Sequence, residues 1–172
     1  ILLAFFLIAV ATIALPDGYL GARGRRRGIH NDHSSLDLVE GGFISIGWGE
    51  LGDLTGTDND RETLKLPAET YPAAKPGAIP VVDGVVFRFM SEMQVGDYVI
   101  SPNKPDRTLN FGIVESDFYV EPPEVIHRTR RRVRWIRTDV PRDDFSKGAL
   151  HEIGSAVTLF RVKNHAHEFF GF

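Results

Sequence analysis

Arginines are concentrated in one short segment of this chain, residues 128–137, and their spacing suits the binding of phosphate groups. If residues 130–137 form a β-strand, alternate side chains point to opposite faces. One face then carries Arg131, Val133 and Trp135, and the other carries Arg130, Arg132 and Arg134. A guanidinium can donate two parallel hydrogen bonds to a phosphate, so the second face predicts contacts to a nucleic-acid backbone. The alternative is a solvated edge strand whose charges prevent aggregation.

The groups that a metal-dependent nuclease needs do not occur in this sequence. Such an enzyme uses a metal-binding acid followed by Glu-x-Lys or Gln-x-Lys, because carboxylates hold the ion and lysine stabilises the attacked phosphate. Gln94 is the only glutamine and has Gly96 two residues on, and no glutamate has lysine at that offset. The histidine pairs at 30/33 and 165/167 lack a third ligand of matching geometry. We therefore expect a binding protein with no catalytic residues, metal or cofactor.

The composition fits a single domain. The chain has 172 residues, of which 42% are hydrophobic and 25% charged, enough for one core and an appendage. It has no cysteine, which excludes a disulfide framework and agrees with a reducing compartment, so we expect a cytoplasmic protein. The net charge of −3 argues against polyanion binding over the whole surface. Only a local basic region, as between His127 and Arg137, could serve nucleic acid.

The N-terminal segment is apolar and then basic. Residues 1–15 are apolar apart from Thr12, and arginines follow at positions 23 and 25–27. A membrane-spanning helix needs about 20 apolar residues, so this run is short. It could be the end of a transmembrane helix that tethers the chain, a signal-peptide remnant, or a segment foreign to the domain. We favour the third interpretation, in which residues 1–27 form an extension outside the fold and residues 28–172 form the domain.

The remaining sequence predicts short strands around few helices. We expect strands at 42–48, 98–100, 108–115, 130–137 and 157–162. Val85, Val86 and Phe89 recur at helical spacing, which predicts a helix that ends near residue 93. A second helix should follow Pro141, and Asn164 should cap a third. Lys104 and Arg107 fall in the predicted 102–107 hairpin loop and are further candidates for backbone contacts. This order indicates an α+β open barrel.

Six segments carry a resemblance to a known family. In chain order they are FISIGWGELGDL, KPGAIP, FRFMSEMQVGDYVISP, GIVE, RRRVRWI and FSKGALHEIGSAVTLFRVKN. Each is unspecific alone, but together they resemble the PUA-like (EVE-like) domain at the N-terminus of Mrr-type restriction endonucleases. The resemblance spans residues 28–172, with Arg27 standing where the family has tryptophan. It implies a PUA-like (EVE-like) open β-barrel with a few flanking short helices.

The resemblance also implies a function. In that family the barrel reads DNA, flipping a modified base, such as methylated cytosine, into an aromatic pocket, and a separate C-terminal nuclease domain cuts. A flipped base needs flat side chains for its faces and polar groups for its edge. The candidates for this base pocket are Trp48, Asp53, Asn31, Asp32, Tyr98 and Tyr119. Alternatively, Trp48 covers the core, the aspartates cap turns, and the tyrosine hydroxyls bond the barrel's own backbone.

A second function is compatible with the same features. PUA-like folds also bind RNA, for which an aromatic pocket and an arginine strand serve equally well. We therefore expect a module that binds DNA carrying a modified base and directs a nuclease domain of a longer protein, with RNA binding as the alternative. A membrane-tethered interaction domain is the third and least favoured interpretation.

Overall fold

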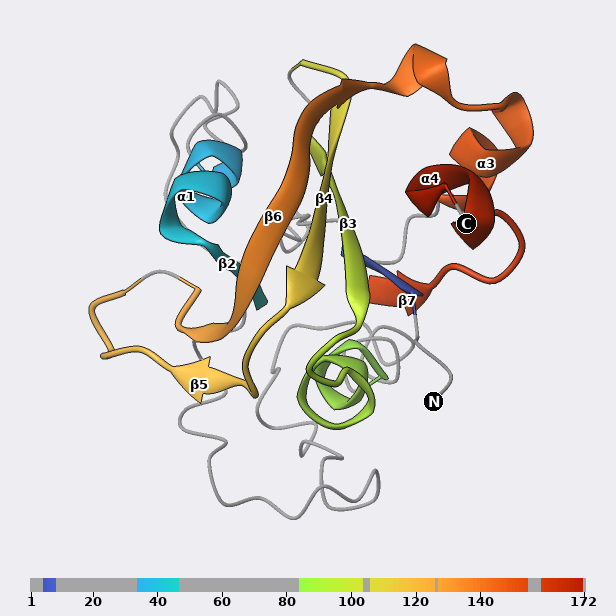
Figure 1. The fold of residues 1–172 in the computed structure, drawn as a ribbon. Coiled ribbons are helices and arrows are strands. Elements are labelled where there is room, and N and C mark those ends of the chain that lie inside the picture. Colours follow the sequence, from blue (N-terminus) through green and yellow to red (C-terminus); the bar gives the residue numbers. More distant parts are fainter. Residues whose placement is uncertain are drawn as a thin grey trace, which may run out of the picture.

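A curled, largely antiparallel sheet is the central element of the structure, a computed structural model that describes residues 5–8, 34–46, 84–103, 106–125, 127–154 and 159–171. Within these residues the sheet has seven strands in the order β2-β6-β4-β3-β1-β7, and β5 also pairs with β6. The strands are β1 (Phe5–Ile8), β2 (Phe43–Ile46), β3 (Tyr98–Asn103), β4 (Thr108–Val114), β5 (Tyr119–Val120), β6 (Thr129–Pro141) and β7 (Leu159–Arg161). Figure 1 shows β6, β4 and β3 side by side as one wall of a half-barrel.

The helices are few and short, so the α+β class predicted from the sequence is confirmed. They are α1 (Ser34–Gly41), η3 (Arg88–Glu92), η4 (Arg142–Asp144), α3 (Lys147–Glu152) and α4 (Ala166–Phe170). In Figure 1, α1 lies beside β6, and α3 and α4 lie together on the other side of the sheet wall. None of the helices in the described ranges is both long and apolar enough to cross a membrane.

Each face of the sheet carries an apolar core, packed against different helices. Val99 and Ile100 are neighbours on β3 and are fully buried, but they point to opposite faces and belong to different apolar clusters. The first core lies between the sheet and helical residues 84–92, and the second lies between the sheet, α3 and α4. The first includes Ile44, Phe89, Val114 and Val133, and the second includes Leu109, Phe111, Ile153 and Phe169.

The helix predicted from apolar spacing is confirmed. Residues 84–92 are helical, Phe89 is fully buried, and the helix ends at Met93, whose N–H donates to the Arg88 carbonyl oxygen at 2.9 Å. That bond spans five residues, so the last turn is a π-helix. The side chain of Arg131 crosses to this turn and donates to the carbonyl oxygens of Phe89 and Met90, at 2.8 and 3.0 Å. These bonds satisfy helix-end carbonyls that would otherwise be buried without donors.

The predicted β3–β4 hairpin is also confirmed, and Gly112 has the role expected for a glycine inside a strand. An added Cβ at Gly112 would lie 2.3 Å from Val133 Cγ1 and 3.0 Å from Trp135 Cε3. Glycine therefore allows the two β6 side chains to lie directly over β4. Trp135 is partly buried in the first core, and its indole N–H donates to the Leu38 carbonyl oxygen at 2.9 Å. This bond ties α1 to the sheet.

Strand β6 is longer than the predicted 130–137 segment. It continues to Pro141 because the ladder with β4 accommodates register shifts next to Phe111. Asp139 has a left-handed backbone (φ 56°), and its N–H donates to Asn110 Oδ1 at 2.9 Å. A side chain thus supplies the acceptor that the irregular ladder lacks. Pro141, which has no N–H, ends the strand.

The N-terminal apolar run contributes a strand, whereas the sequence favoured a segment outside the fold. Strand β1 pairs in parallel with β3 and antiparallel with β7, and so joins these two strands into one sheet. A short apolar run suits a strand as well as a membrane segment, and periodicity does not separate the two. Helix α1 was not predicted either. The remaining expectations for 1–27 lie outside the described residues.

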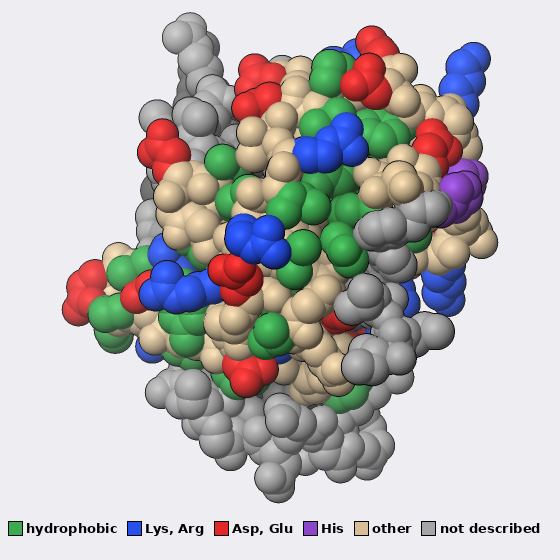
Figure 2. All heavy atoms as spheres, in the orientation of Figure 1, with side chains coloured by type: hydrophobic (Ala, Val, Ile, Leu, Met, Phe, Trp, Pro, Cys, Tyr) green, Lys and Arg blue, Asp and Glu red, His purple; other side chains and the backbone are tan. Residues whose placement is uncertain are grey.

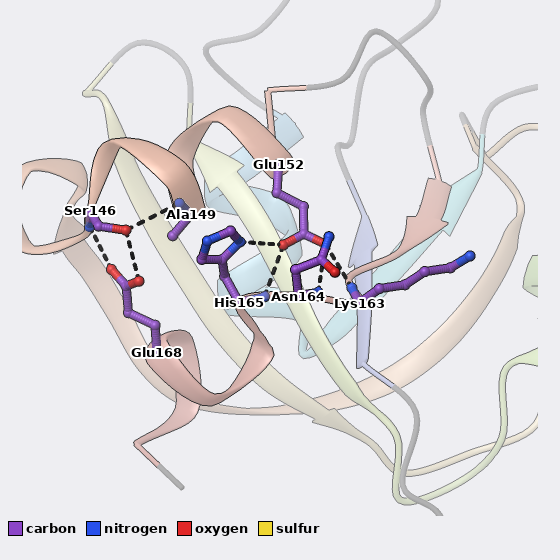
Figure 3. A network of polar contacts seen from close by, with 7 residues as sticks. All are labelled: Ser146, Ala149, Glu152, Lys163, Asn164, His165 and Glu168. Carbon is purple, nitrogen blue, oxygen red and sulfur yellow. Dashed lines mark hydrogen bonds and ion pairs between the residues drawn. The ribbon is translucent and has the colours of Figure 1, made fainter.

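Two glutamates join the C-terminal helices by long-range hydrogen bonds (Figure 3). Glu152 accepts the backbone N–H groups of Lys163, Asn164 and His165 at 2.7 to 2.9 Å, and His165 Nδ1 lies 2.8 Å from Glu152 Oε2. Glu168 accepts the N–H and the hydroxyl of Ser146, the residue that caps α3. The predicted cap was Asn164, but His165 occupies the N-cap of α4 and its side chain makes no capping bond.

Candidate nucleic-acid interface

The arginine strand has the alternation that the sequence predicts. Arg131 and Val133 are 1% and 3% exposed and point toward the first core, as does Trp135. Arg132 and Arg134 are exposed, and Arg130 is partly so. The sheet surface opposite the first core therefore carries Arg130, Arg132 and Arg134, and we call it the arginine face.

Strand register adds two of the predicted pocket residues to this surface. Residues directly opposite in neighbouring strands point to the same side of a sheet. Tyr119 is opposite Arg130, so its side chain belongs to the arginine face. Tyr98 is opposite Ile113, which in turn is opposite Arg134, so Tyr98 shares that face as well. Five of the predicted contact residues, which come from three strands, thus share one surface.

The two tyrosines differ in what covers them. The Tyr98 ring lies 4.6 Å from the Phe170 ring, centroid to centroid, so α4 covers that end of the arginine face. Tyr119 lies on the short strand β5, away from α3 and α4 in Figure 1, and is half-buried. Both tyrosines are partly buried, but only Tyr119 lies beside the exposed Arg132.

Arg130 is largely occupied by other parts of the protein. Its side chain is 17% exposed, and its guanidinium carbon lies 3.9 Å from the centre of the Phe43 ring. Its Nε donates to the carbonyl oxygen of His127 at 3.0 Å, and Nη1 lies 3.7 Å from Glu121 Oε1. Burial, and secondly the Arg130 charge, lower the pKa of His127, which keeps this imidazole neutral at neutral pH. Arg130 therefore meets a ligand only at the rim of its guanidinium.

Arg134 and Arg132 reach solvent in different ways. The Arg134 side chain is 58% exposed, but its Nε donates to Glu115 Oε1 at 2.8 Å. The Arg132 guanidinium lies over the Tyr119 ring, 5.7 Å from its centre. Among the described residues Arg132 makes no ion pair. Its donors, oriented by the ring below, are the ones most available to an anion.

Arg131 has a structural environment despite its place in the same row. Besides its two bonds to the π-helix, its Nη1 donates to the Ser116 carbonyl oxygen at 3.0 Å and lies 3.8 Å from Asp117 Oδ1. Burial lowers the pKa of its guanidinium, and the carboxylates of Asp117 and Asp97 oppose that shift. The sequence placed Arg131 on the inward face without predicting these partners.

The acidic residues that pair with the arginines were not predicted as part of the site. Glu115 directly follows β4 and Glu121 directly follows β5. This part of the chain runs antiparallel to β6, as the bond from the Glu115 N–H to the Arg132 carbonyl oxygen shows. Acidic residues at 115–124 were visible in the sequence, and the register of the hairpin was the signal that could have paired them with the arginines. On the face drawn in Figure 2, basic, acidic and apolar side chains interleave, with no single basic patch.

Five predicted site residues lie outside the described residues: Trp48, Asp53, Asn31, Asp32 and Lys104. Arg107 is described and is exposed, with a left-handed backbone (φ 55°) in the β3–β4 turn. It lies at the end of the sheet where Thr108 pairs with Pro141, whereas Arg130 and Arg132 lie near the start of β6. In the part of the chain that the structure describes, no three histidine, aspartate or glutamate side chains are grouped as a metal site.

A model of the family described as "Domain of unknown function (DUF8426)" matches residues 25–162 of the chain. The matched range includes every described strand except β1, and it ends before α4. All residues of the arginine face lie within it. No curated protein and no solved structure matches the chain.

Proposed function

We propose that this chain, which belongs to the DUF8426 family, is a non-catalytic DNA-binding module whose arginine face contacts the phosphate backbone. The proposal includes a PUA-like architecture for the half-barrel and a role in directing a separate nuclease domain. One observation carries it: strand register gathers Arg130, Arg132, Arg134 and Tyr119 on one surface. An arginine guanidinium binds a phosphate through two parallel hydrogen bonds, and a nearby aromatic ring can stack against a base that has left the duplex.

A solvated edge strand would explain exposed arginines, but it explains the arrangement less well. Strand β6 is an interior strand, paired with β2 on one side and with β4 and β5 on the other. It has no need of charges that prevent edge-to-edge aggregation over residues 129–132. The stacking of Arg132 on Tyr119 also presents its donors in a fixed orientation, which favours a ligand over bulk solvent.

The first experiment replaces the three arginines together by glutamine. For the variant R130Q/R132Q/R134Q we expect the affinity for duplex DNA to be at least about tenfold lower near 100 mM salt. The slope of log affinity against log salt should become shallower by about one to three units, about one for each phosphate contact that is lost. The loss should be similar for unrelated sequences, because phosphate contacts carry no sequence information. Fluorescence anisotropy of a labelled duplex over a series of salt concentrations measures both quantities.

A matched variant controls for net charge. R142Q/K147Q/K163Q removes the same three positive charges from the region around α3 and β7, away from the arginine face. It should keep most of the affinity, since distant surface charges are screened over about 8 Å at physiological salt. Equal losses in the two triple variants, or unchanged affinity of the first at low salt, would remove the arginine face from the binding site.

Competition between ligands tests the proposed target. The protein is first bound to a labelled plain duplex. Three unlabelled ligands then compete with this duplex for the protein: plain duplex DNA, duplex DNA with methylated cytosine, and single-stranded RNA. We expect the modified duplex to compete best, because the binding of a flipped base adds to the backbone contacts. Stronger competition by the RNA would instead favour an RNA-binding module. Equal competition by both duplexes would exclude recognition of that modification.

A further inference from the structure

We infer that Glu115 and Glu121 restrain nucleic-acid binding by holding two arginines of the arginine face in ion pairs, so that Arg132 is the main anchor for phosphate. This inference rests on the proposed function and assigns a role to two acidic residues of the same site. A face with three arginines would bind any polyanion, whereas a face with one available arginine binds only ligands that add other contacts. The glutamates thereby set selectivity.

The geometry of the Arg134 pair supports this restraint. Arg134 Nε donates to Glu115 Oε1 at 2.8 Å, the distance of a charge-assisted hydrogen bond. Both side chains are about half exposed, at 58% and 48%. An exposed pair of this kind is weak in water, so a phosphate can displace the carboxylate, but the displacement costs part of the binding free energy.

The second ion pair, between Arg130 and Glu121, lies at the other end of the arginine face. Arg130 Nη1 lies 3.7 Å from Glu121 Oε1, and the same guanidinium is held over Phe43. Glu121 is fixed by its backbone, because its N–H donates to the Arg128 carbonyl oxygen at 2.8 Å and its own carbonyl oxygen accepts Arg128 Nε at 3.1 Å. The backbone of Glu121 is therefore held beside Arg128, within reach of Arg130.

Arg132 lies between these two pairs and is the exception. Its guanidinium stacks on Tyr119, and within the described ranges no carboxylate pairs with it. A bare polyanion on this face therefore meets one available guanidinium, because the arginines on either side of Arg132 are paired with carboxylates. The expected ligand is thus one that gains stacking or base contacts at Tyr119, such as an unstacked nucleotide, and not a bare polyanion.

The test removes the carboxylates and keeps the arginines. E115Q/E121Q should bind a labelled plain DNA duplex about five- to twentyfold tighter than the wild-type protein at about 50 mM salt, and its log affinity should fall more steeply with log salt, by about one to two units. E124Q is the matched control, because Glu124 is exposed on the same segment and makes no ion pair with a described residue. It should change the affinity less than about twofold.

A double-mutant cycle separates restraint from simple repulsion. If Glu115 acts by holding Arg134, then E115Q should gain nothing when it is added to R134Q. An equal gain in both backgrounds would show that the carboxylate repels the phosphates directly, and this result overturns the inference.

Two further outcomes distinguish the inference from the proposed function. If the wild-type protein binds and R132Q weakens binding, but E115Q/E121Q behaves as E124Q does, the restraint is wrong and the binding function stands. If neither the wild-type protein nor any variant binds DNA or RNA at low salt, the proposed function fails and the inference fails with it. The inference is supported by two results together. E115Q/E121Q binds DNA more tightly and with a steeper salt dependence than the wild-type protein and E124Q do, and E115Q brings no gain in the R134Q background.

Discussion

Arg131 and Arg132 are neighbours on β6 with opposite environments. Arg131 is 1% exposed, and three carbonyl oxygens accept its donors. Arg132 is exposed and stacks on one ring. A lysine in place of Arg131 keeps the charge but presents one compact ammonium in place of a planar fork, so it cannot reach three separate acceptors. The same substitution at Arg132 removes only a surface stacking contact.

We therefore predict that R131K and R132K differ in stability. R131K should lower the free energy of unfolding by about 2 kcal/mol or more, because buried carbonyl oxygens lose their donors. R132K should lower it by less than about 0.5 kcal/mol. Urea denaturation followed by tryptophan fluorescence measures both variants. Equal stability of R131K and the wild-type protein would mean that the buried guanidinium is not needed to cap the π-helix.

At this scale the sequence predicted directions but not partners. Alternation of side chains on a strand is a local property, so residues 130–135 could be assigned to faces correctly. The pairing of Arg134 with Glu115 and of Arg130 with Glu121 depends on how β4, β5 and β6 align, which is a property of the folded sheet. The burial of Arg131 was harder to predict, because a charged side chain is expected to be buried only where specific partners exist.

Among the elements, α4 is held by a residue from another helix. Burial alone would raise the pKa of Glu152, but the backbone N–H groups of Asn164, Lys163 and His165, together with the His165 side chain, lower it to about 2. The folded state thus favours the ionised carboxylate. An ordinary glutamate titrates near 4.3 in an unfolded chain, so this contribution to stability is complete above that pH and is lost as the pH falls toward 2.

We predict an acid-dependent loss for E152Q. At pH 7 the variant should be less stable by about 2 kcal/mol, because a neutral amide is a weaker acceptor for three N–H groups than a carboxylate. The difference from the wild-type protein should shrink as the pH is lowered from 5 toward 2. Thermal or urea denaturation at several pH values measures it. E40Q, at an exposed glutamate of α1, should show little effect at any pH, and a constant difference for E152Q across this range would contradict the account.

Elements with local signals were predicted well, and those without were not. Apolar spacing identified the helix that ends at Met93, and glycine and aspartate marked the turn before β3. The cap of α4 was assigned to Asn164 because capping usually uses a nearby side chain. His165 occupies the N-cap without a side-chain capping bond, and Glu152 on α3 instead accepts the three N–H groups that directly precede α4. Strand β1 was missed for a related reason: only its pairing with β3 and β7 distinguishes it from other apolar runs.

For the whole molecule, the sheet with a core on each face leaves one region of its surface for the proposed binding. Helical residues 84–92 cover one face, and α3 and α4 cover the Phe111 end of the other. The part of the arginine face near β5 carries exposed charges and a half-buried aromatic ring. The α+β class followed from the order of elements, while the PUA-like identity and the base pocket at Trp48, Asp53, Asn31 and Asp32 remain predictions.

The most direct test maps the DNA contact on the protein by NMR. Backbone amide shifts of the ¹⁵N-labelled chain are followed during titration with a short DNA duplex at low salt. We predict the largest changes at Tyr119, Arg130, Arg132 and Arg134, with little change in α3. Saturable changes in α3 and α4 without any at these four residues would contradict the claim that the arginine face binds nucleic acid.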